Sequence, residues 1–408
     1  MIDKNNRLNV AIVGLGFGKE FIPIYQHHPR TKMYAICQRT KARLDDVGDQ
    51  FGVANRYTTF EELIQDPAVD AVHINSPIHL HAAQSIAALK AGKHVACTVP
   101  AATSVDECSE IVRAAEASGR NYMMMETSIY TREFLYICEL RDTGKLGRIQ
   151  FMRGCHQQEM ARWPGYWEGL PPMHYATHAV SPCLAIVKGE AGQVSCLGSG
   201  RIQEKLASKY GSPFAVESAL FQVRDQPLAF EVTRSLFETS RQYVESFDVY
   251  GDRMSFEWTQ IEGERPVVHI GEKPMRVEVP DYARLLPEPI QRFTTAGVYG
   301  QENAHLSFIQ GGGHGGSHPH LVHEFVSSIV EGRPSFPDVY QSVNWTCAGI
   351  CAHESAIGGG QIVHLPEFLP EPGGTSVSAP MSNGKEIHDS PESGMATVAS
   401  FACGDDYR

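Results

Sequence analysis

The first 125 residues alternate between short apolar runs and longer segments whose apolar residues recur every three or four positions. The apolar runs predict buried strands at Leu8–Val13, Lys32–Cys37, Ala71–Ile74, His94–Cys97 and Asn121–Met125. The periodic segments predict helices at Phe17–His28, Lys41–Phe51, His79–Ala91 and Ser104–Ser118. Strands alternating with helices at this interval predict βαβ units and a parallel, doubly wound α/β sheet.

Beyond about residue 147 the pattern changes to strand-like segments without a helix between each pair. They fall at Ile149–Cys155, Phe214–Val223, Leu228–Leu236, Tyr243–Tyr250 and Arg253–Trp258. This predicts an α+β domain with a largely antiparallel, open sheet. Helical segments follow at Leu321–Val330 and Val339–Ile357. From about Pro370 the chain is rich in Pro, Gly, Ser and acidic residues without periodicity, which predicts a disordered tail.

These changes divide the 408 residues into a first domain at 1–125, a second domain at 126–369 and a tail at 370–408. The formal net charge of −12 argues against nucleic acid or an anionic membrane as a partner, because both select for an excess of Lys and Arg. The start of the chain carries no apolar signal region, and the ten cysteines are scattered singly. We therefore expect a cytoplasmic, reduced protein.

A glycine motif, Gly14-Leu15-Gly16-Phe17-Gly18-Lys19, follows the first predicted strand and opens the first predicted helix. Gly14 lets the chain turn, and Gly16 lets the backbone approach a pyrophosphate at the helix N-terminus. A tight turn alone is the alternative, but the strand, the helix and the later βα units favour a dinucleotide-binding Rossmann domain. At the end of the second strand, Gln38 would hydrogen-bond the adenosine ribose, while Arg39 would stack on adenine or reach a 2′-phosphate, so that NAD and NADP both stay open.

Two further turns lie at the carboxyl ends of parallel strands, where such sheets bind ligands. They are Asn75-Ser76-Pro77-Ile78-His79-Leu80-His81 and Cys97-Thr98-Val99-Pro100. With the glycine motif they resemble the glucose–fructose oxidoreductase/inositol dehydrogenase (Gfo/Idh/MocA) family over roughly residues 8–369. That resemblance implies that Asn75, Pro77 and His81 line the cofactor site. The family's dehydrogenases carry a proton-transferring Lys where this chain has Val99.

The NAD-dependent glycoside hydrolases of the same superfamily, such as those of glycoside hydrolase family 109, share the loss of this lysine. Three segments resemble theirs, in the same order along the chain: Met124-Met125-Glu126-Thr127-Ser128-Ile129-Tyr130, Tyr175-Ala176-Thr177-His178-Ala179-Val180-Ser181-Pro182 and Gly313-His314-Gly315-Gly316. The local sequences differ in detail, which favours a sister family with another sugar specificity.

The resemblance implies a redox-neutral cycle on a small carbohydrate or glycoside. The sugar is oxidised at C3, the aglycone leaves by elimination, water adds and the ketone is reduced again. A recycled cofactor favours NAD over NADP. The implied catalytic residues are Glu126, Tyr175, His178 and His314, with Glu126 also beside the cofactor; Tyr175 and His178, three apart, would share a helical face. A plain sugar or polyol dehydrogenase is the alternative, and a cofactor-bound sensor is disfavoured because these groups are retained.

Several other polar and aromatic residues are candidates for binding the substrate. They are Tyr130, His156, Arg162, Trp163, Trp167, His174 and His318. Aromatic rings stack on sugar faces, although core packing accounts for them equally well. Arg153 and Arg162, with the histidines, would suit an anionic sugar. The His-rich segment at 314–320 lacks Cys, Asp or Glu at metal-ligand spacing, so that we expect a substrate loop and no metal. Family resemblance further implies a homo-oligomer, a dimer or a tetramer.

Overall fold

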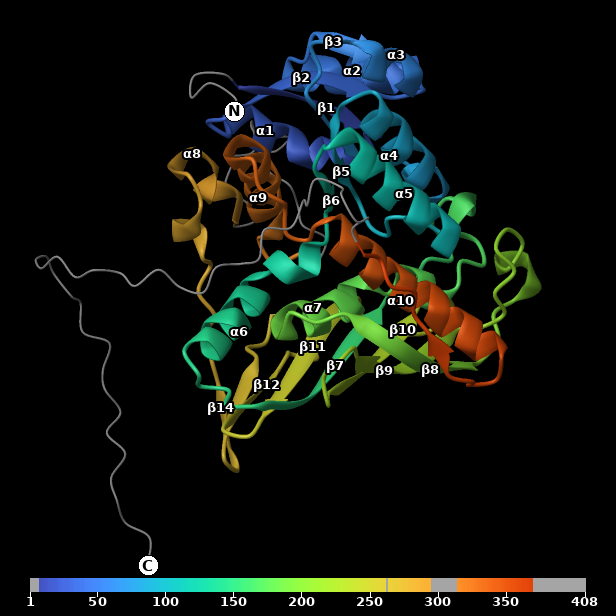
Figure 1. The fold of residues 1–408 in the computed structure, drawn as a ribbon, viewed down its shortest axis with the longest axis vertical. Coiled ribbons are helices and arrows are strands. Elements are labelled where there is room, and N and C mark those ends of the chain that lie inside the picture. The colour runs from blue at the N-terminus through green and yellow to red at the C-terminus, as the bar shows by residue number, and fades with distance from the viewer. Residues whose placement is uncertain (1–6, 262, 295–313, 370–408) are drawn as a thin grey trace, which may run out of the picture.

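The computed structural model describes residues 7–261, 263–294 and 314–369. The predicted tail and Gly311–Gly313 lie outside these residues. The described chain forms two sheets, and the helices α6 (Arg132–Asp142), α7 (Thr177–Val187) and α10 (Val339–Ile357) lie between them (Figure 1). No helix in this part of the chain is long and apolar enough to cross a membrane.

The first sheet has six parallel strands in the order β3-β2-β1-β4-β5-β6, as the alternating pattern predicts. In chain order these are β1 (Leu8–Val13), β2 (Thr31–Cys37), β3 (Asn55–Tyr57), β4 (Ala71–Ile74), β5 (His94–Cys97) and β6 (Tyr122–Met124). Its helices are α1 (Ile22–His27), α2 (Lys41–Phe51), α3 (Phe60–Gln65), α4 (His81–Lys90) and α5 (Val105–Ser118). The sequence pattern missed β3 and α3, which are too short to establish a period.

The second sheet has nine strands in the order β14-β13-β12-β11-β7-β10-β9-β8-β15. In chain order they are β7 (Ile149–Gln157), β8 (Ala191–Ser199), β9 (Val216–Val223), β10 (Ala229–Ser235), β11 (Val244–Gly251), β12 (Met254–Glu257), β13 (Val267–Ile270), β14 (Lys273–Arg276) and β15 (Val363–His364). All neighbouring pairs are antiparallel except β7 and β10, which run parallel. The predicted, largely antiparallel sheet is therefore confirmed.

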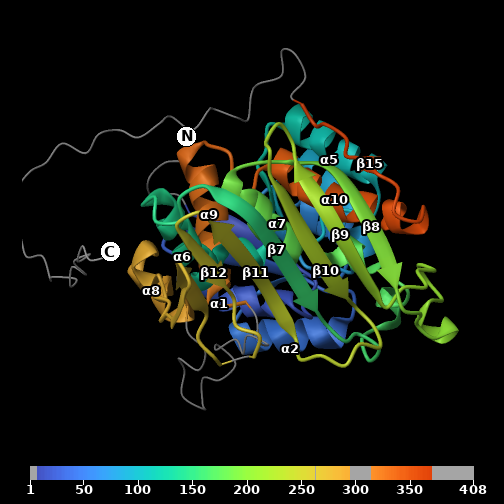
Figure 2. The same cartoon turned by 90° about the horizontal axis from the view of Figure 1, so that it is seen from below.

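One face of the second sheet is covered by helices, and the other is open in the view from below (Figure 2). On the covered face α7 packs on β7, β10 and β11, and α10 packs on β8. Because side chains alternate along a strand, the register decides which residues share that face. Arg234 of β10 pairs with His156 of β7, which pairs in turn with Glu245 of β11, so that all three point toward α7.

Helix α7 approaches the sheet closely because β7 has a glycine beneath it. A Cβ at Gly154 would lie 2.1 Å from the carbonyl oxygen of Ala179. The sequence pattern did not separate α7 as a helix, since its residues from Thr177 to Ile186 are all buried and leave no polar face. This helix carries His178, so that its distance from the sheet fixes the position of that imidazole.

Two later helical segments of the chain return to the core of the first sheet. Helix α9 (Ser317–Glu331) buries Leu321, Phe325 and Ile329 in the cluster that contains Val10 and Ile12 of β1. The short helix α8 (Glu288–Gln291) places Ile290 in the same cluster. As a result, the residues just before α9 lie beside the glycine turn that follows β1.

We expect Gly154→Ala to destabilise the protein by about 1–3 kcal/mol, because the added methyl group pushes α7 away from β7. Urea unfolding measures this effect. Gly165→Ala is the control, since its Cβ would meet only the flexible carboxylate of Glu168 at 3.4 Å. Equal stabilities for the two variants would contradict the close contact between α7 and β7.

Candidate active site

Four polar side chains from different parts of the chain meet between the two sheets. Glu126 follows β6, His178 lies in the first turn of α7, and His156 and Glu245 come from the second sheet. The side chains of Glu126, His156 and Glu245 are at most 1% exposed, and that of His178 is 4% exposed. The carboxyl end of the first sheet therefore meets the covered face of the second in a cluster of titratable groups.

A short contact in this cluster joins the turn after β6 to helix α7, and so links the first sheet to the second. Nδ1 of His178 lies 2.5 Å from Oε1 of Glu126. The backbone N–H and the hydroxyl of Ser128 donate to the same carboxylate oxygen at 3.0 and 2.9 Å. These bonds fix the orientation of the carboxylate, and the carboxylate in turn fixes the orientation of the His178 ring.

The Glu126–His178 contact favours the charged form of both partners. Burial opposes protonation of the His178 ring, but the charges of Glu126 and Glu245 outweigh it and raise its pKa to about 8. Burial likewise opposes ionisation of Glu126, but the charge and hydrogen bond of His178 hold the pKa of that carboxyl below its usual value. His178 is therefore an imidazolium at neutral pH and is able to donate a proton.

Glu245 was not identified from the sequence. Its Oε1 atom lies 3.7 Å from Nε2 of His178, 3.7 Å from Nε2 of His314 and 3.8 Å from Nε2 of His156. The hydroxyl of Tyr243 donates to the same oxygen. A single acidic residue in a strand belongs to no motif that would indicate this role. Only the alternation along β11, combined with its pairing to β7, points to it.

His156 and His314 have the opposite charge state from His178. Burial lowers the pKa of His156 well below its usual value, and the charges of Arg234 and His178 lower it further. Burial also lowers the pKa of His314, against the raising effect of Glu245. Both rings are therefore neutral at neutral pH and are able to accept a proton.

Tyr175 is held beside the cluster by a buried arginine, Arg234, which no sequence motif indicates. Arg234 donates from Nε to the carbonyl of Tyr175 at 2.9 Å, and its guanidinium lies 5.3 Å from the centre of the Tyr175 ring. Burial lowers the pKa of Arg234 to about 10. The Tyr175 and His178 rings are 5.6 Å apart. The expectation of one shared helical face is wrong, because Tyr175 ends the short helix η5 (Pro172–Tyr175), before α7 begins.

The glycine turn after β1 has the shape that a dinucleotide requires. Gly14 has φ +83°, and a Cβ there would lie 2.5 Å from the carbonyl oxygen of Asn75. Gly16 faces open space, with nothing within 4 Å of a Cβ position. Gly18, one position before the usual third glycine, takes over the close packing, since its Cβ would lie 2.8 Å from Ile12.

Side chains around this turn form hydrogen bonds to its backbone and present polar groups beside it. Gln38 accepts a hydrogen bond from the backbone N–H of Leu15 at 3.0 Å, and Arg39 is exposed beside it. Oδ1 of Asn75 is buried and has no hydrogen-bond partner among the described residues. An open glycine backbone with a buried acceptor nearby fits a bound dinucleotide.

The two other cofactor-side turns are tied together by His81. Its ring nitrogens lie 2.7 Å from the Pro100 carbonyl and 2.8 Å from the Ser76 carbonyl. This places the ring between the turns after β4 and β5, with Pro77 in the first of them. Val99 is 6% exposed in the second turn, where it supplies no proton-transferring group.

Phe17 connects the glycine turn with the histidine cluster. Its ring lies 5.9 Å from His314 and 5.5 Å from His318. His318 also packs against Phe21 at 4.6 Å and is fully buried in α9. His314 therefore lies between the cofactor turn and Glu245, whereas His318 packs behind it.

The remaining predicted residues lie farther from the cluster. The hydroxyl of Tyr130 donates to the Phe336 carbonyl at 2.7 Å, and His174 packs 5.3 Å from His353. Trp167 is buried 5.1 Å from the Tyr175 ring, and Trp163, 43% exposed, stacks edge-on against Trp167. Arg162 is exposed in the same loop.

The grouping of Arg153 with the site histidines is wrong. Arg153 points to the opposite face of β7 from His156, where it donates to Glu231 at 2.9 Å. Arg234, the buried cation on the correct face, has its donors occupied by Gln158 and by the carbonyls of Tyr175, His156 and Ser235. Within the described chain, the cluster thus offers an anionic sugar no uncommitted arginine.

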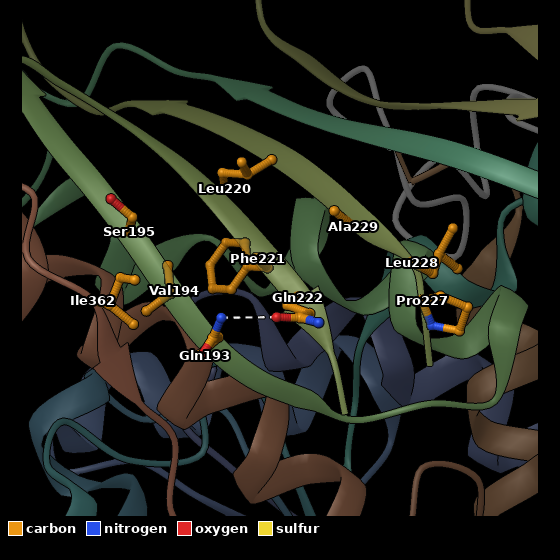
Figure 3. Close-up of a pocket in the computed structure, with 10 residues that line it drawn as sticks. All are labelled: Gln193, Val194, Ser195, Leu220, Phe221, Gln222, Pro227, Leu228, Ala229 and Ile362. Carbon is orange, nitrogen blue, oxygen red and sulfur yellow. Dashed lines mark hydrogen bonds between the residues drawn. The ribbon is translucent and has the colours of Figure 1, made fainter. Parts of the chain in front are cut away.

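Neither a metal site nor a second chemical site stands out in the described residues. No group of three or more His, Cys, Asp or Glu among them has an arrangement that would hold a metal ion. A hollow on the open face of the second sheet has no titratable side chain (Figure 3). It is lined by Gln193, Val194, Ser195, Leu220, Phe221, Gln222, Pro227, Leu228, Ala229 and Ile362.

Comparison with known proteins agrees with this geometry. Residues 8–126 match the Gfo/Idh/MocA family model, described as an oxidoreductase family with an NAD-binding Rossmann fold. Over these residues the chain is similar to that family. The cofactor of this Rossmann domain is NAD.

Similar proteins extend the comparison beyond this domain. An uncharacterized oxidoreductase of Synechocystis is 32% identical over 151 residues, which cover 37% of this chain and 41% of that protein. A glycosyl hydrolase family 109 protein of Bacteroides thetaiotaomicron is 22% identical and covers 90% of this chain and 85% of its own. A solved levoglucosan dehydrogenase, in complex with NADH and levoglucosan, has a TM-score of 0.70 at 20% identity, over 89% of this chain and all of its own. The likeness to this structure shows a shared fold.

We expect Gly16→Ala to weaken NADH binding by at least about tenfold without changing stability, because its methyl group enters the space where the pyrophosphate approaches. Gly18→Ala, in contrast, should destabilise the protein by about 1–3 kcal/mol through its contact with Ile12. NADH fluorescence titration and urea unfolding separate the two effects. The assignment of the turn fails if Gly16→Ala binds NADH normally.

We also expect the stabilising effect of Glu126 to depend on pH. The pKa of His178 is raised from 6.5 to about 8, so that its contribution is complete below pH 6.5 and is lost as pH rises through 8. Glu126→Gln should therefore cost on the order of 1 kcal/mol more at pH 6 than at pH 9. Urea unfolding at both pH values tests this, with Glu231→Gln on the open face as control. A cost that does not change with pH would contradict the buried pair.

Proposed function

We propose that this protein is an NAD-dependent glycoside hydrolase. It oxidises the sugar transiently at C3, eliminates the aglycone, adds water and reduces the ketone again. The observation that carries the proposal is a buried cluster that holds proton donors and proton acceptors together. A simple dehydrogenation needs one proton acceptor for the hydroxyl, whereas elimination and water addition require further proton transfers.

The cluster assigns a task to each side chain. Charged His178 donates a proton from Nε2, while Glu126 holds its Nδ1–H and keeps that nitrogen turned away from the substrate. Neutral His314 accepts a proton, and its place beside Phe17 puts it next to the cofactor turn. Tyr175, whose pKa is raised by burial, supplies a hydroxyl group. The centre of its ring lies 5.6 Å from the centre of the His178 ring. His156 and Trp167 line the substrate side.

The turns at the carboxyl ends of β1, β4 and β5 would hold the cofactor. The Gly14–Gly18 backbone would receive the pyrophosphate, Gln38 and Arg39 would bind the adenosine side, and Asn75 and Pro77 would contribute from the turn after β4. The chemistry that NAD supplies when bound is reversible hydride exchange with a sugar carbon. The protein's share is position, exclusion of water and proton transfer.

One comparison and one motif resemblance support a hydrolase. A protein named for glycosyl hydrolase family 109 covers 85% of its own length in the match, so that the likeness includes the second domain. Val99 also stands where the family's dehydrogenases carry lysine, and its side chain cannot transfer a proton. We further propose a neutral carbohydrate substrate and a homo-oligomer.

A sugar or polyol dehydrogenase is the second candidate. The observation in its favour is the Glu126–His178 contact, since this pair offers a titratable group that would replace the absent lysine. Levoglucosan dehydrogenase also shares the fold. The two candidates differ in products: a hydrolase releases aglycone without net NADH, whereas a dehydrogenase accumulates NADH and a ketone.

A solvent-isotope experiment tests the mechanism. We expect a panel of aryl glycosides to release phenol without net NADH formation, and hydrolysis in D₂O to place deuterium at C2 of the released sugar. The label enters because elimination breaks the C2–H bond, which a direct displacement at C1 leaves intact. NMR of the product detects it. Hydrolysis with C2 wholly unlabelled would overturn the mechanism, and net NADH would favour the dehydrogenase.

Variants of the cluster connect this mechanism to residues. His178→Ala and Tyr175→Phe should each reduce kcat by a factor on the order of 10²–10⁴, if proton transfer is rate-limiting. Thr177→Ala, one position before His178, is the matched control and should change kcat much less. Similar losses in all three variants would indicate a general disturbance of α7.

A further inference from the structure

Glu245 is the one buried carboxylate of the cluster that the proposed mechanism does not use. Its side chain is 1% exposed, and Oε2 has no hydrogen-bond partner among the described residues. Oε1 faces the Nε2 atoms of His156, His178 and His314. These imidazoles come from a strand, a helix and a loop, and the same carboxylate oxygen is the point they share.

The distances around Oε1 are informative because they are so similar. Separations of 3.7, 3.7 and 3.8 Å are too long for direct hydrogen bonds. They are short enough for one further oxygen atom to bond both the carboxylate and an imidazole. Neither ring nitrogen of His156 has a hydrogen-bond partner in the described chain, although the ring is fully buried. A buried ring without partners points to a ligand.

We propose that Glu245 is a positioning residue that holds the Nε2 edges of His156, His178 and His314 around a single hydroxyl oxygen of the sugar. This inference rests on the proposed function for the identity of the substrate. The hydroxyl accepts a hydrogen bond from the charged His178 ring. When the sugar is oxidised, the proton of this O–H group passes to the neutral His314 ring, where an N–H bond forms. The hydride from the same carbon would be taken up by bound NAD.

The charges around the site agree with this role. Burial opposes protonation of both His178 and His314, whereas the charge of Glu245 raises the pKa of each ring; His178 in addition lowers the pKa of His314. Arg234 lowers the pKa of His178 and His156 from the neighbouring strand. Glu126 faces His178 from the turn after β6, and Tyr243 donates to Glu245. Removing the carboxylate charge therefore has a defined consequence for the histidines.

Histidine titration by NMR tests the proposal in the intact NAD-loaded protein without any turnover. With ¹³C-labelled histidine, we expect Glu245→Gln to lower the pKa of His178 by on the order of one unit. The resonance is assigned from its absence in His178→Gln. Glu231→Gln, the same chemical change on the open face, should leave the titration unchanged. An unaltered His178 titration in folded Glu245→Gln overturns the proposal, whether or not the protein is a glycosidase.

Activity on the responsive aryl glycoside supplies the second readout. Glu245→Gln should reduce kcat at least tenfold with little change in KM, and should move the high-pH limb of the kcat profile to lower pH. Glu245→Asp keeps the charge, so that the high-pH limb of its kcat profile should return part of the way to that of the unmodified protein. This variant replaces Glu245→Gln in the experiment if the Gln variant does not fold. A profile unmoved in both variants overturns the proposal. The proposal is also overturned if the purified protein contains one transition-metal ion per chain and Glu245→Gln loses it, because the carboxylate would then be a metal ligand.

Discussion

The contact between Glu126 and His178 is the interaction on which the rest of the site depends. It joins the end of the first sheet to a helix that packs on the second, and both partners are almost completely buried. Two charges are costly to remove from water, and their attraction repays that cost only with good geometry and additional hydrogen bonds. Ser128 supplies two such bonds. The pair therefore requires that the end of the first sheet and helix α7 meet in one particular arrangement.

The second sheet acts as the frame that turns this pair into a larger cluster. Pairing of β10, β7 and β11 places Arg234, His156 and Glu245 in one row across the covered face. Arg234 fixes the backbone at Tyr175, and Gly154 lets α7 approach the same row. Since one charged imidazole and two neutral ones lie around one carboxylate, proton donors and acceptors coexist within a small volume. Their environments separate their pKa values, and this separation divides acid from base.

Helix α9, which comes after β14 of the second sheet in the sequence, packs back against the core of the first sheet and so contributes to the site. Helix α9 is held there by apolar residues that join the core around β1. This packing positions His314, which lies just before the helix. Its ring is near Phe17 of the glycine turn and near Glu245 of the second sheet. Three parts of the chain that are remote in sequence thus meet beside the cofactor turn.

The sequence by itself determined the parallel sheet, because each of its main strands is a continuous apolar run and each longer helix has a periodic apolar face. It also determined the glycine turn and pointed to Glu126, Tyr175, His178 and His314 through short motifs. Helix α7 carries no period since it is buried all round, and Glu245, Arg234 and Tyr243 belong to no motif. Their roles arise from strand register, which pairs residues roughly 80 to 90 positions apart. Such pairing depends on the folded sheet, and only the tertiary structure decides it.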